Sequence, residues 1–149
     1  MRAFLILQEL EKTIRYTLGK TERLTSRKTI EQLFKAGKSF SVSPIRVVYL
    51  FQEEEETLNN KQVQAGFTVS SKYFKKAVDR NRIKRLLREC WRLQKHELKK
   101  RQEEPGRSLA VFLLYIGNEI PQYSLIFEKT SAIIKRLQKI INENAIGNT

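Results

Sequence analysis

The chain has 149 residues, which is enough for one domain with a hydrophobic core, and it contains no internal repeat. Its 29 lysines and arginines outnumber 16 acidic residues, giving a net charge of +13 and a pI of about 10.0. A polyanion is therefore the first partner to expect, and a membrane surface the second. No apolar run approaches the roughly 18 residues of a membrane-spanning helix, and residues 4–7 are too short for a signal-peptide core, which predicts a cytoplasmic protein. One cysteine excludes an internal disulfide, and a single histidine beside it argues against a zinc site.

Residues 1–18 mix apolar and charged side chains at loosely helical spacing. A docked helix, a disordered extension and a start codon assigned too far upstream all fit this pattern. We treat 1–18 as an N-terminal extension of unknown order, 19–142 as the single domain and 143–149 as a C-terminal tail.

The first predicted helix follows Thr25 and Ser26, which are typical N-cap residues, and ends at Gly37. Three stretches then alternate apolar and polar residues with the period of two that indicates strands, at 40–42, 45–51 and 63–69. The acidic run at 53–56 predicts a solvated hairpin loop between the second and third strands. Consecutive carboxylates in such a loop cannot all converge on one ion, so no metal site is expected there.

From Ala77 the period becomes helical, and an apolar stripe follows at Ile83, Leu86, Leu87, Cys90, Leu93 and Leu98. The continuous apolar run 109–115 predicts a central strand that is buried on both faces. Ser124 can cap a last helix, in which apolar residues recur with helical spacing from Ile133 to Ile141. The predicted order is helix, three strands, helix, strand, helix, an α+β arrangement with one sheet covered by helices.

Most of the net positive charge lies in residues 72–101, which contain 13 basic and 3 acidic residues. On a helix, Arg80, Lys84, Arg88 and Arg92 fall on one stripe, where like charges four residues apart repel by a few tenths of a kcal/mol per pair. A face that only keeps the protein soluble usually mixes its signs, so this segregation favours nucleic-acid binding. Arginine suits bidentate contact with phosphate, and Asn81 can reach a base edge or a ribose 2′-hydroxyl.

Three other residues of this helix have structural interpretations that compete with a functional role. Cys90 falls on the apolar stripe and is expected to be a small buried thiol. Trp91 neighbours the basic face, so both stacking on a base and burial against the last helix are open. His96 has no Ser, Cys or Asp partner at motif spacing, which fits a phosphate contact or a bystander better than a general base.

Two strings carry a specific resemblance. The first is GFTVSSK, from Gly66 to Lys72, and the second is KKAVDRNRIKRLLRE, from Lys75 to Glu89. Arg23-Leu24 precedes the first predicted helix, and Phe34-Lys35-x-Gly37 ends it. At this spacing the chain resembles the bacterial ribonuclease P protein family, over roughly residues 20 to 140.

The resemblance implies an α-β-β-β-α-β-α sandwich with a mixed sheet, similar to the second domain of a small-subunit ribosomal protein. It also implies that the basic helix joins the third and fourth strands by a left-handed crossover, an exception to the usual right-handed rule.

The resemblance further implies that a large RNA is the catalyst and that it removes the 5′ leader from precursor tRNA with bound Mg²⁺. The protein is expected to supply no catalytic residue, to bind no organic cofactor and to have no obligate protein partner. The family's contacts to that RNA correspond to Arg80, Asn81, Arg82, Lys84, Arg85 and Arg88. A cleft between the first helix and the sheet holds the leader in the family, and its lining corresponds to Arg27, Ile30, Phe34, Tyr49, Phe67 and Lys72.

This sequence departs from the family pattern at two places in the cleft. Ile30 stands where an aromatic residue is common, and Ser71 replaces one lysine of the usual pair, so leader affinity or register is expected to differ. The spacing of Ile30, Phe34 and Tyr49 would equally build a hydrophobic core. A ribosome-associated or general structured-RNA-binding protein of the same fold is the alternative, and a self-sufficient metal-dependent nuclease is disfavoured because no acidic or histidine cluster is present.

Overall fold

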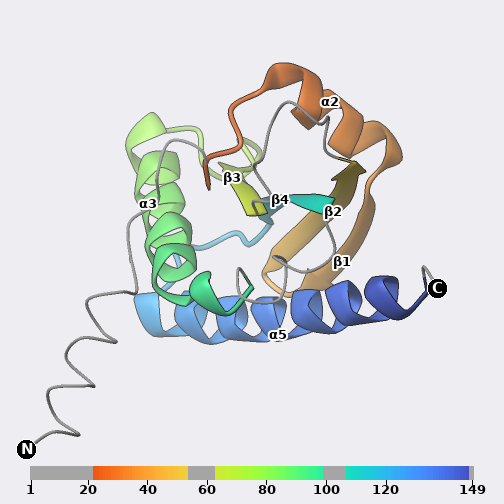
Figure 1. The fold of residues 1–149 in the computed structure, drawn as a ribbon. Coiled ribbons are helices and arrows are strands. Elements are labelled where there is room, and N and C mark those ends of the chain that lie inside the picture. Colours follow the sequence, from red (N-terminus) through yellow and green to blue (C-terminus); the bar gives the residue numbers. More distant parts are fainter. Residues whose placement is uncertain (1–21, 54–62, 99–106, 148–149) are drawn as a thin grey trace, which may run out of the picture.

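The computed structural model describes residues 22–53, 63–98 and 107–147. The order of its helices and strands agrees with the order that the sequence predicts (Figure 1). The elements are α2 (Arg27–Ala36), β1 (Lys38–Val42), β2 (Ile45–Glu53), β3 (Val63–Val69), α3 (Ala77–Gln94), β4 (Arg107–Tyr115) and α5 (Tyr123–Gly147).

The strands form one mixed sheet in the order β1-β2-β4-β3. β1 pairs antiparallel with β2 and β2 antiparallel with β4, whereas β3 runs parallel to β4. The central position predicted for residues 109–115 is confirmed. The hairpin predicted between the second and third strands is wrong, because β4 lies between β2 and β3 and pairs with both. Most of the loop in question, residues 54–62, lies outside the described residues.

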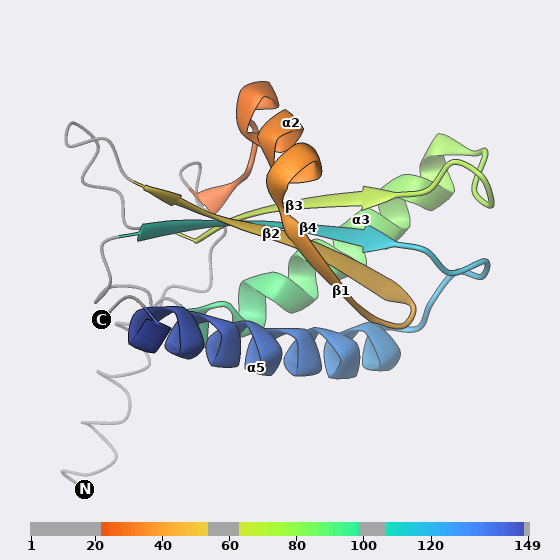
Figure 2. The same cartoon turned by 90° about the vertical axis from the view of Figure 1, so that its right-hand side faces the viewer.

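The sheet separates two layers of unequal size (Figure 2). α3 and α5 cover one face, where the larger core includes Val47, Val111, Leu87 and Leu137. α2 lies on the other face over a small cluster of Leu24, Leu33, Val48 and Ala110. The chain is therefore the predicted α+β sandwich with α3 as the crossover between the parallel strands β3 and β4. The left-handed sense of that crossover stays a prediction.

The predicted ends of α2 are confirmed in atomic detail. The Ser26 side chain accepts a hydrogen bond from the Thr29 amide at 3.4 Å, which satisfies one of the unpaired donors of the first turn. At the other end the Gly37 amide donates to Leu33 at 2.9 Å. A Cβ atom on residue 37 would lie 2.3 Å from that Leu33 oxygen, so only glycine allows this tight turn into β1.

The segment before α2 is attached to the far edge of the sheet. Arg23 forms a parallel bridge with Ala65 of β3, and the Leu24 amide donates to the Ala65 carbonyl at 2.9 Å. Next to this bridge the Lys95 ammonium forms an ion pair with the Glu22 carboxylate, and both residues are buried. Residues 22–24 thus extend the sheet beyond β3 and connect it to the end of α3.

The last helix is longer than predicted at both ends. α5 begins at Tyr123, so Ser124 lies inside its first turn and does not cap it. It continues to Gly147 because no proline or glycine interrupts it earlier, and so it includes most of the predicted tail 143–149. The N-terminal extension 1–18 lies outside the described residues.

Candidate RNA-binding surface

α3 has the two faces that its sequence predicts. Ile83, Leu87, Cys90 and Trp91 are buried in the larger core, and the predicted burial of Cys90 is confirmed. Burial raises the pKa of the Cys90 thiol to about 11, which keeps it neutral. Trp91 is only 1% exposed, so the structure favours burial over base stacking for its indole ring.

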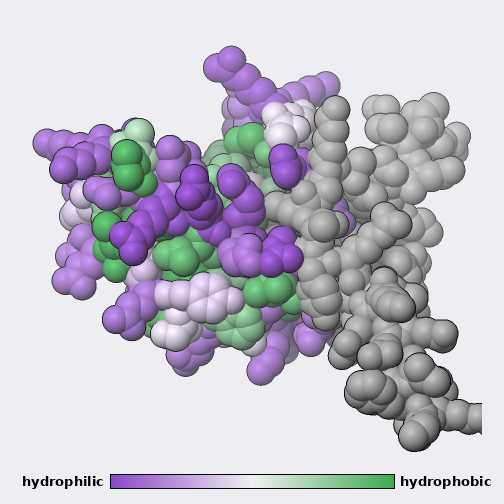
Figure 3. All heavy atoms as spheres, turned by 90° about the vertical axis from the view of Figure 1, so that its left-hand side faces the viewer, coloured by the Kyte–Doolittle hydropathy of each residue, from purple (hydrophilic) through white to green (hydrophobic). Residues whose placement is uncertain are grey.

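The other face of α3 is exposed and basic. Asn81, Arg82, Arg85 and Arg88 are exposed and Lys84 is half-buried. Figure 3 looks onto the side of the molecule that carries α3, where hydrophilic side chains gather on the surface and hydrophobic atoms are visible between them. Within the described part of the chain, these arginines form no ion pair and no hydrogen bond. Among the described residues, no acidic group therefore opposes their positive charges.

Arg80 differs from the other predicted contacts because its own chain already uses it. Its Nη1 atom donates to the backbone oxygens of Phe74 and Lys75, at 2.8 Å each. These two bonds hold the connection between β3 and α3 against the first turn of the helix. Arg80 thus positions the start of α3, and only its remaining guanidinium donors are available to a ligand.

Arg92, at the other end of the basic stripe, is engaged as well. Its Nε atom donates to Glu89 at 3.1 Å, and the same hydrogen-bonded pair lowers the pKa of the Glu89 carboxyl. The unopposed charge is therefore concentrated in the middle of α3, between two arginines that have internal partners.

The residues predicted for the leader cleft do not lie on one surface. Tyr49 and Phe67 are on the face of the sheet covered by α3 and α5, where Tyr49 packs against Phe40 and Phe67 lies 6.4 Å from the Trp91 ring. Their place in the cleft is therefore wrong. Side chains alternate along a strand, so their neighbours Val48 and Gly66 are the residues that face α2.

The remaining cleft residues are on the α2 side or at the end of the sheet. Ile30 is half-buried against the small cluster, and Phe34 is 51% exposed. Arg27 is exposed and forms a 3.8 Å pair with Glu31, which at such exposure contributes little. Lys72 is exposed in the β3–α3 connection, with Nζ 5.4 Å from the centre of the Tyr73 ring.

Sequence reasoning missed the part of the sheet that completes this surface. Phe112 contacts Phe34 edge-on at 5.4 Å between ring centres. Two residues further along β4, Leu114 is on the same face, and it is paired with Arg46 on one side and Thr68 on the other. Alternation along β4 would place Phe112 on the face toward α2. Because nearly every residue of this strand is apolar, the sequence does not show which residues face α2.

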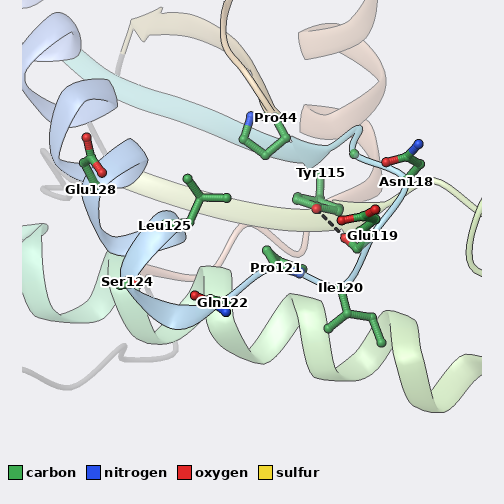
Figure 4. A pocket seen from close by; sticks show the side chains of 11 residues that line it. Pro44, Tyr115, Asn118, Glu119, Ile120, Pro121, Gln122, Ser124, Leu125 and Glu128 are labelled. Carbon is green, nitrogen blue, oxygen red and sulfur yellow. Dashed lines mark hydrogen bonds between the residues drawn. The ribbon is translucent and has the colours of Figure 1, made fainter.

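A hollow of about 710 Å³ lies where the β1–β2 turn meets the connection from β4 to α5 (Figure 4). The Tyr115 hydroxyl donates to the Glu119 carbonyl beside it. Glu119 and Glu128 contribute carboxylates to the lining, which contains no lysine or arginine. Because these groups repel phosphate, the basic face of α3 is the better candidate for binding nucleic acid.

The described residues contain no group of three His, Cys, Asp or Glu side chains placed to hold a metal ion. No described helix is long and apolar enough to cross a membrane.

Comparisons with known proteins identify the family. The family model described as Ribonuclease P matches residues 18–138. The ribonuclease P protein component of Porphyromonas gingivalis is 32% identical over 133 residues, covering 89% of this chain and 95% of its own. That of Chlorobium phaeobacteroides is 32% identical over 129 residues and covers 82% and 88%. The solved RNase P protein from Thermotoga maritima is 26% identical and superposes with a TM-score of 0.56 over 77% of this chain and 96% of its own. This chain therefore belongs to the ribonuclease P protein family, the protein components of a tRNA-processing ribonucleoprotein endonuclease.

Proposed function

We propose that this chain binds the catalytic RNA of ribonuclease P through the middle of α3 and holds the 5′ leader of precursor tRNA on the α2 side of its sheet. The observation that supports the first part is the set of exposed arginines on α3, Arg82, Arg85 and Arg88, which have no partner within the described residues.

The free energy of RNA binding would come mainly from these arginines. Each guanidinium can donate two hydrogen bonds to one phosphate, and the contact releases counterions that surround the RNA. Since these side chains have no ion-pair partner among residues 22–53, 63–98 and 107–147, binding would break no ion pair within that part of the chain. Asn81 and Lys84 are adjacent and would add a polar contact and a point charge, whereas Arg80 would act chiefly by fixing the helix start.

The leader would lie along Phe34, Phe112 and Leu114, with Arg46 and Lys72 near its phosphates. Aromatic faces stack on unpaired bases with little sequence demand, and basic side chains follow the backbone. This surface retains four residues of the predicted cleft: Phe34, Lys72, Arg27 and Ile30. Tyr49 and Phe67 are replaced by residues on the opposite face of the sheet.

The chemistry would belong to the RNA partner. Cleavage in this family's enzyme depends on a metal, and we propose Mg²⁺ held mainly by the RNA, since the described residues bring no suitable set of ligands together. Positive charge on the protein would reduce phosphate repulsion where two RNAs meet, and so lower the concentration of Mg²⁺ that cleavage needs. The cytoplasm, where bacterial tRNA is made, is the proposed location.

Reconstitution tests this function directly. The purified chain is mixed with a bacterial ribonuclease P RNA and precursor tRNA at low Mg²⁺, and the rate of leader removal is measured. We expect the chain to accelerate cleavage strongly and to cleave nothing without the RNA. Cleavage by the protein alone, or no stimulation of the RNA, would contradict the proposal. Equal binding to unrelated structured RNAs would favour the general RNA-binding alternative.

A further inference from the structure

A cavity of about 280 Å³ lies at the outer edge of β3, beside the basic face of α3. Three parts of the chain line it. The segment before α2 contributes Arg23 and Thr25, β3 contributes Gly66 and Phe67, and α3 contributes Arg88. The sheet, the basic helix and the N-terminal segment therefore meet at one small hollow.

In the described part of the chain, no backbone pairs with the outer edge of β3 at Phe67. The Leu24 amide bonds the Ala65 carbonyl, so the Ala65 peptide groups face outward, away from β4. Because strand residues alternate, the N–H and C=O of Phe67 point to the same edge. The chain turns away at Thr25 to begin α2, and no described residue pairs with the Phe67 groups. The cavity thus presents a peptide donor and acceptor side by side.

Two arginines and no acidic residue line the cavity. Arg23 and Arg88 are both exposed, and neither forms an ion pair or hydrogen bond within the described residues. One helical turn beyond Arg88, by contrast, Arg92 is paired with Glu89. Two guanidinium groups that share a cavity repel each other until an anion lies between them, and a phosphate fits their donor geometry.

We infer that this cavity holds one unpaired nucleotide of the RNA that α3 binds, with its phosphate between Arg23 and Arg88 and its base edge against the Phe67 peptide groups. The inference rests on the proposed function and adds to it a defined position for a single nucleotide. Each base carries a donor and an acceptor on its Watson–Crick edge, so the site distinguishes unpaired from paired nucleotides and tolerates any sequence. The volume is at the lower limit of small-molecule pockets, about 300 Å³, which suits one nucleotide and not a base pair.

Titration of the full chain with mononucleotides tests the site without the RNA subunit. AMP, UMP, adenosine and inorganic phosphate are each added to the ¹⁵N-labelled protein, and the amide shift of Phe67 is followed by NMR. We expect AMP and UMP to move the Phe67 amide and to saturate at a concentration at least threefold lower than phosphate does. If the nucleotides bind no better than phosphate, or leave the Phe67 amide unmoved, the inference is wrong.

Matched variants then test the site in the complex. Arg23→Gln and Lys28→Gln each remove one exposed positive charge from the same region, but only Arg23 lines the cavity. We expect Arg23→Gln to weaken binding to ribonuclease P RNA about tenfold and Lys28→Gln less than about threefold. Thr25→Leu, which fills the cavity without changing charge, should also weaken binding, and a wild-type urea midpoint would show that it is folded.

The two ideas fail in different ways. If the wild-type chain does not bind ribonuclease P RNA, the proposed function is wrong, and the mononucleotide titration still decides the site. If the wild type binds and Arg23→Gln loses no more than Lys28→Gln, the site is wrong and the proposed function stands.

Discussion

The two surfaces proposed to bind RNA differ in how they are built. The α3 surface is one helix face, with unopposed arginines outside and a fully buried stripe inside. The α2-side surface is assembled from a helix and neighbouring strands, and its aromatic residues Phe34 and Phe112 also pack against each other. A surface on one helix can be altered without disturbing the fold. A composite surface couples binding to stability, and the following tests separate the two.

The largest expected effect is on the α3 surface. The double variant Arg82→Ala/Arg85→Ala removes two phosphate contacts from exposed positions, so RNA affinity should fall by roughly a hundredfold, about 2.7 kcal/mol. The slope of log affinity against log salt should decrease by about two. Filter binding at several salt concentrations measures both. Lys135→Ala/Lys139→Ala removes the same charge from exposed positions on α5 and should leave the slope near its wild-type value.

Phe67→Ala should affect stability more than binding of the leader. The ring packs against Trp91 in the larger core, and its removal should lower the free energy of unfolding by about 2–3 kcal/mol. Urea unfolding followed by circular dichroism measures this loss. If Phe67→Ala keeps wild-type stability but loses affinity for leader-bearing tRNA, Phe67 contacts the leader after all.

Phe34→Ala should show the opposite balance. Half of this side chain is exposed, so we expect a stability loss of about 1 kcal/mol or less and a weakening of precursor tRNA binding by about 1–2 kcal/mol. Binding of mature tRNA, which has no leader, is the control and should not change. An equal loss of affinity for precursor and mature tRNA would show that Phe34 does not contact the leader.

The last test concerns the buried side of α3 and the dependence of stability on pH. Burial raises the pKa of the Cys90 thiol to about 11, above the value of about 8.5 expected in an unfolded chain. The unfolded state therefore loses its proton first, and the contribution of Cys90 to stability is complete below about pH 8.5 and is lost as the pH rises towards 11. Urea midpoints of the wild type and Cys90→Ala across this range measure the difference. Parallel pH profiles would contradict burial of the thiol.

The sequence predicted helix faces better than strand faces, for a physical reason. On α3 the apolar and basic residues differ in kind, so the period of 3.6 separated Ile83 and Leu87 from the basic stripe that contains Arg88, and the structure buries the first two and exposes the third. In β2 the residues on both faces are apolar, and Tyr49 and Val48 were equally acceptable neighbours of α2. Tyr49 and Phe67 were carried over from the family resemblance, and a shift of one residue in that correspondence is enough to exchange the two faces of a strand.

Other features depend on contacts between distant segments. Arg80 is an arginine on α3 like Arg82 and Arg85, which have no partner among the described residues. Only the path of the chain before α3 brings the Phe74 and Lys75 carbonyls to Arg80. The position of β4 between β2 and β3 could not be predicted from the order of the strands along the chain. The cavity at Arg23 forms because Arg23 bridges to Ala65, and no pattern of neighbouring residues in the sequence predicts that bridge.

The burial of Trp91 has a practical consequence. It is the single tryptophan of the chain, and it lies beneath α3 with 1% of its surface exposed and its ring 6.4 Å from that of Phe67. Its fluorescence therefore reports whether α3 is seated on the sheet, while RNA bound to the outer face lies beyond direct contact with the indole. The native chain thus contains an intrinsic optical probe that distinguishes loss of the fold from loss of the ligand.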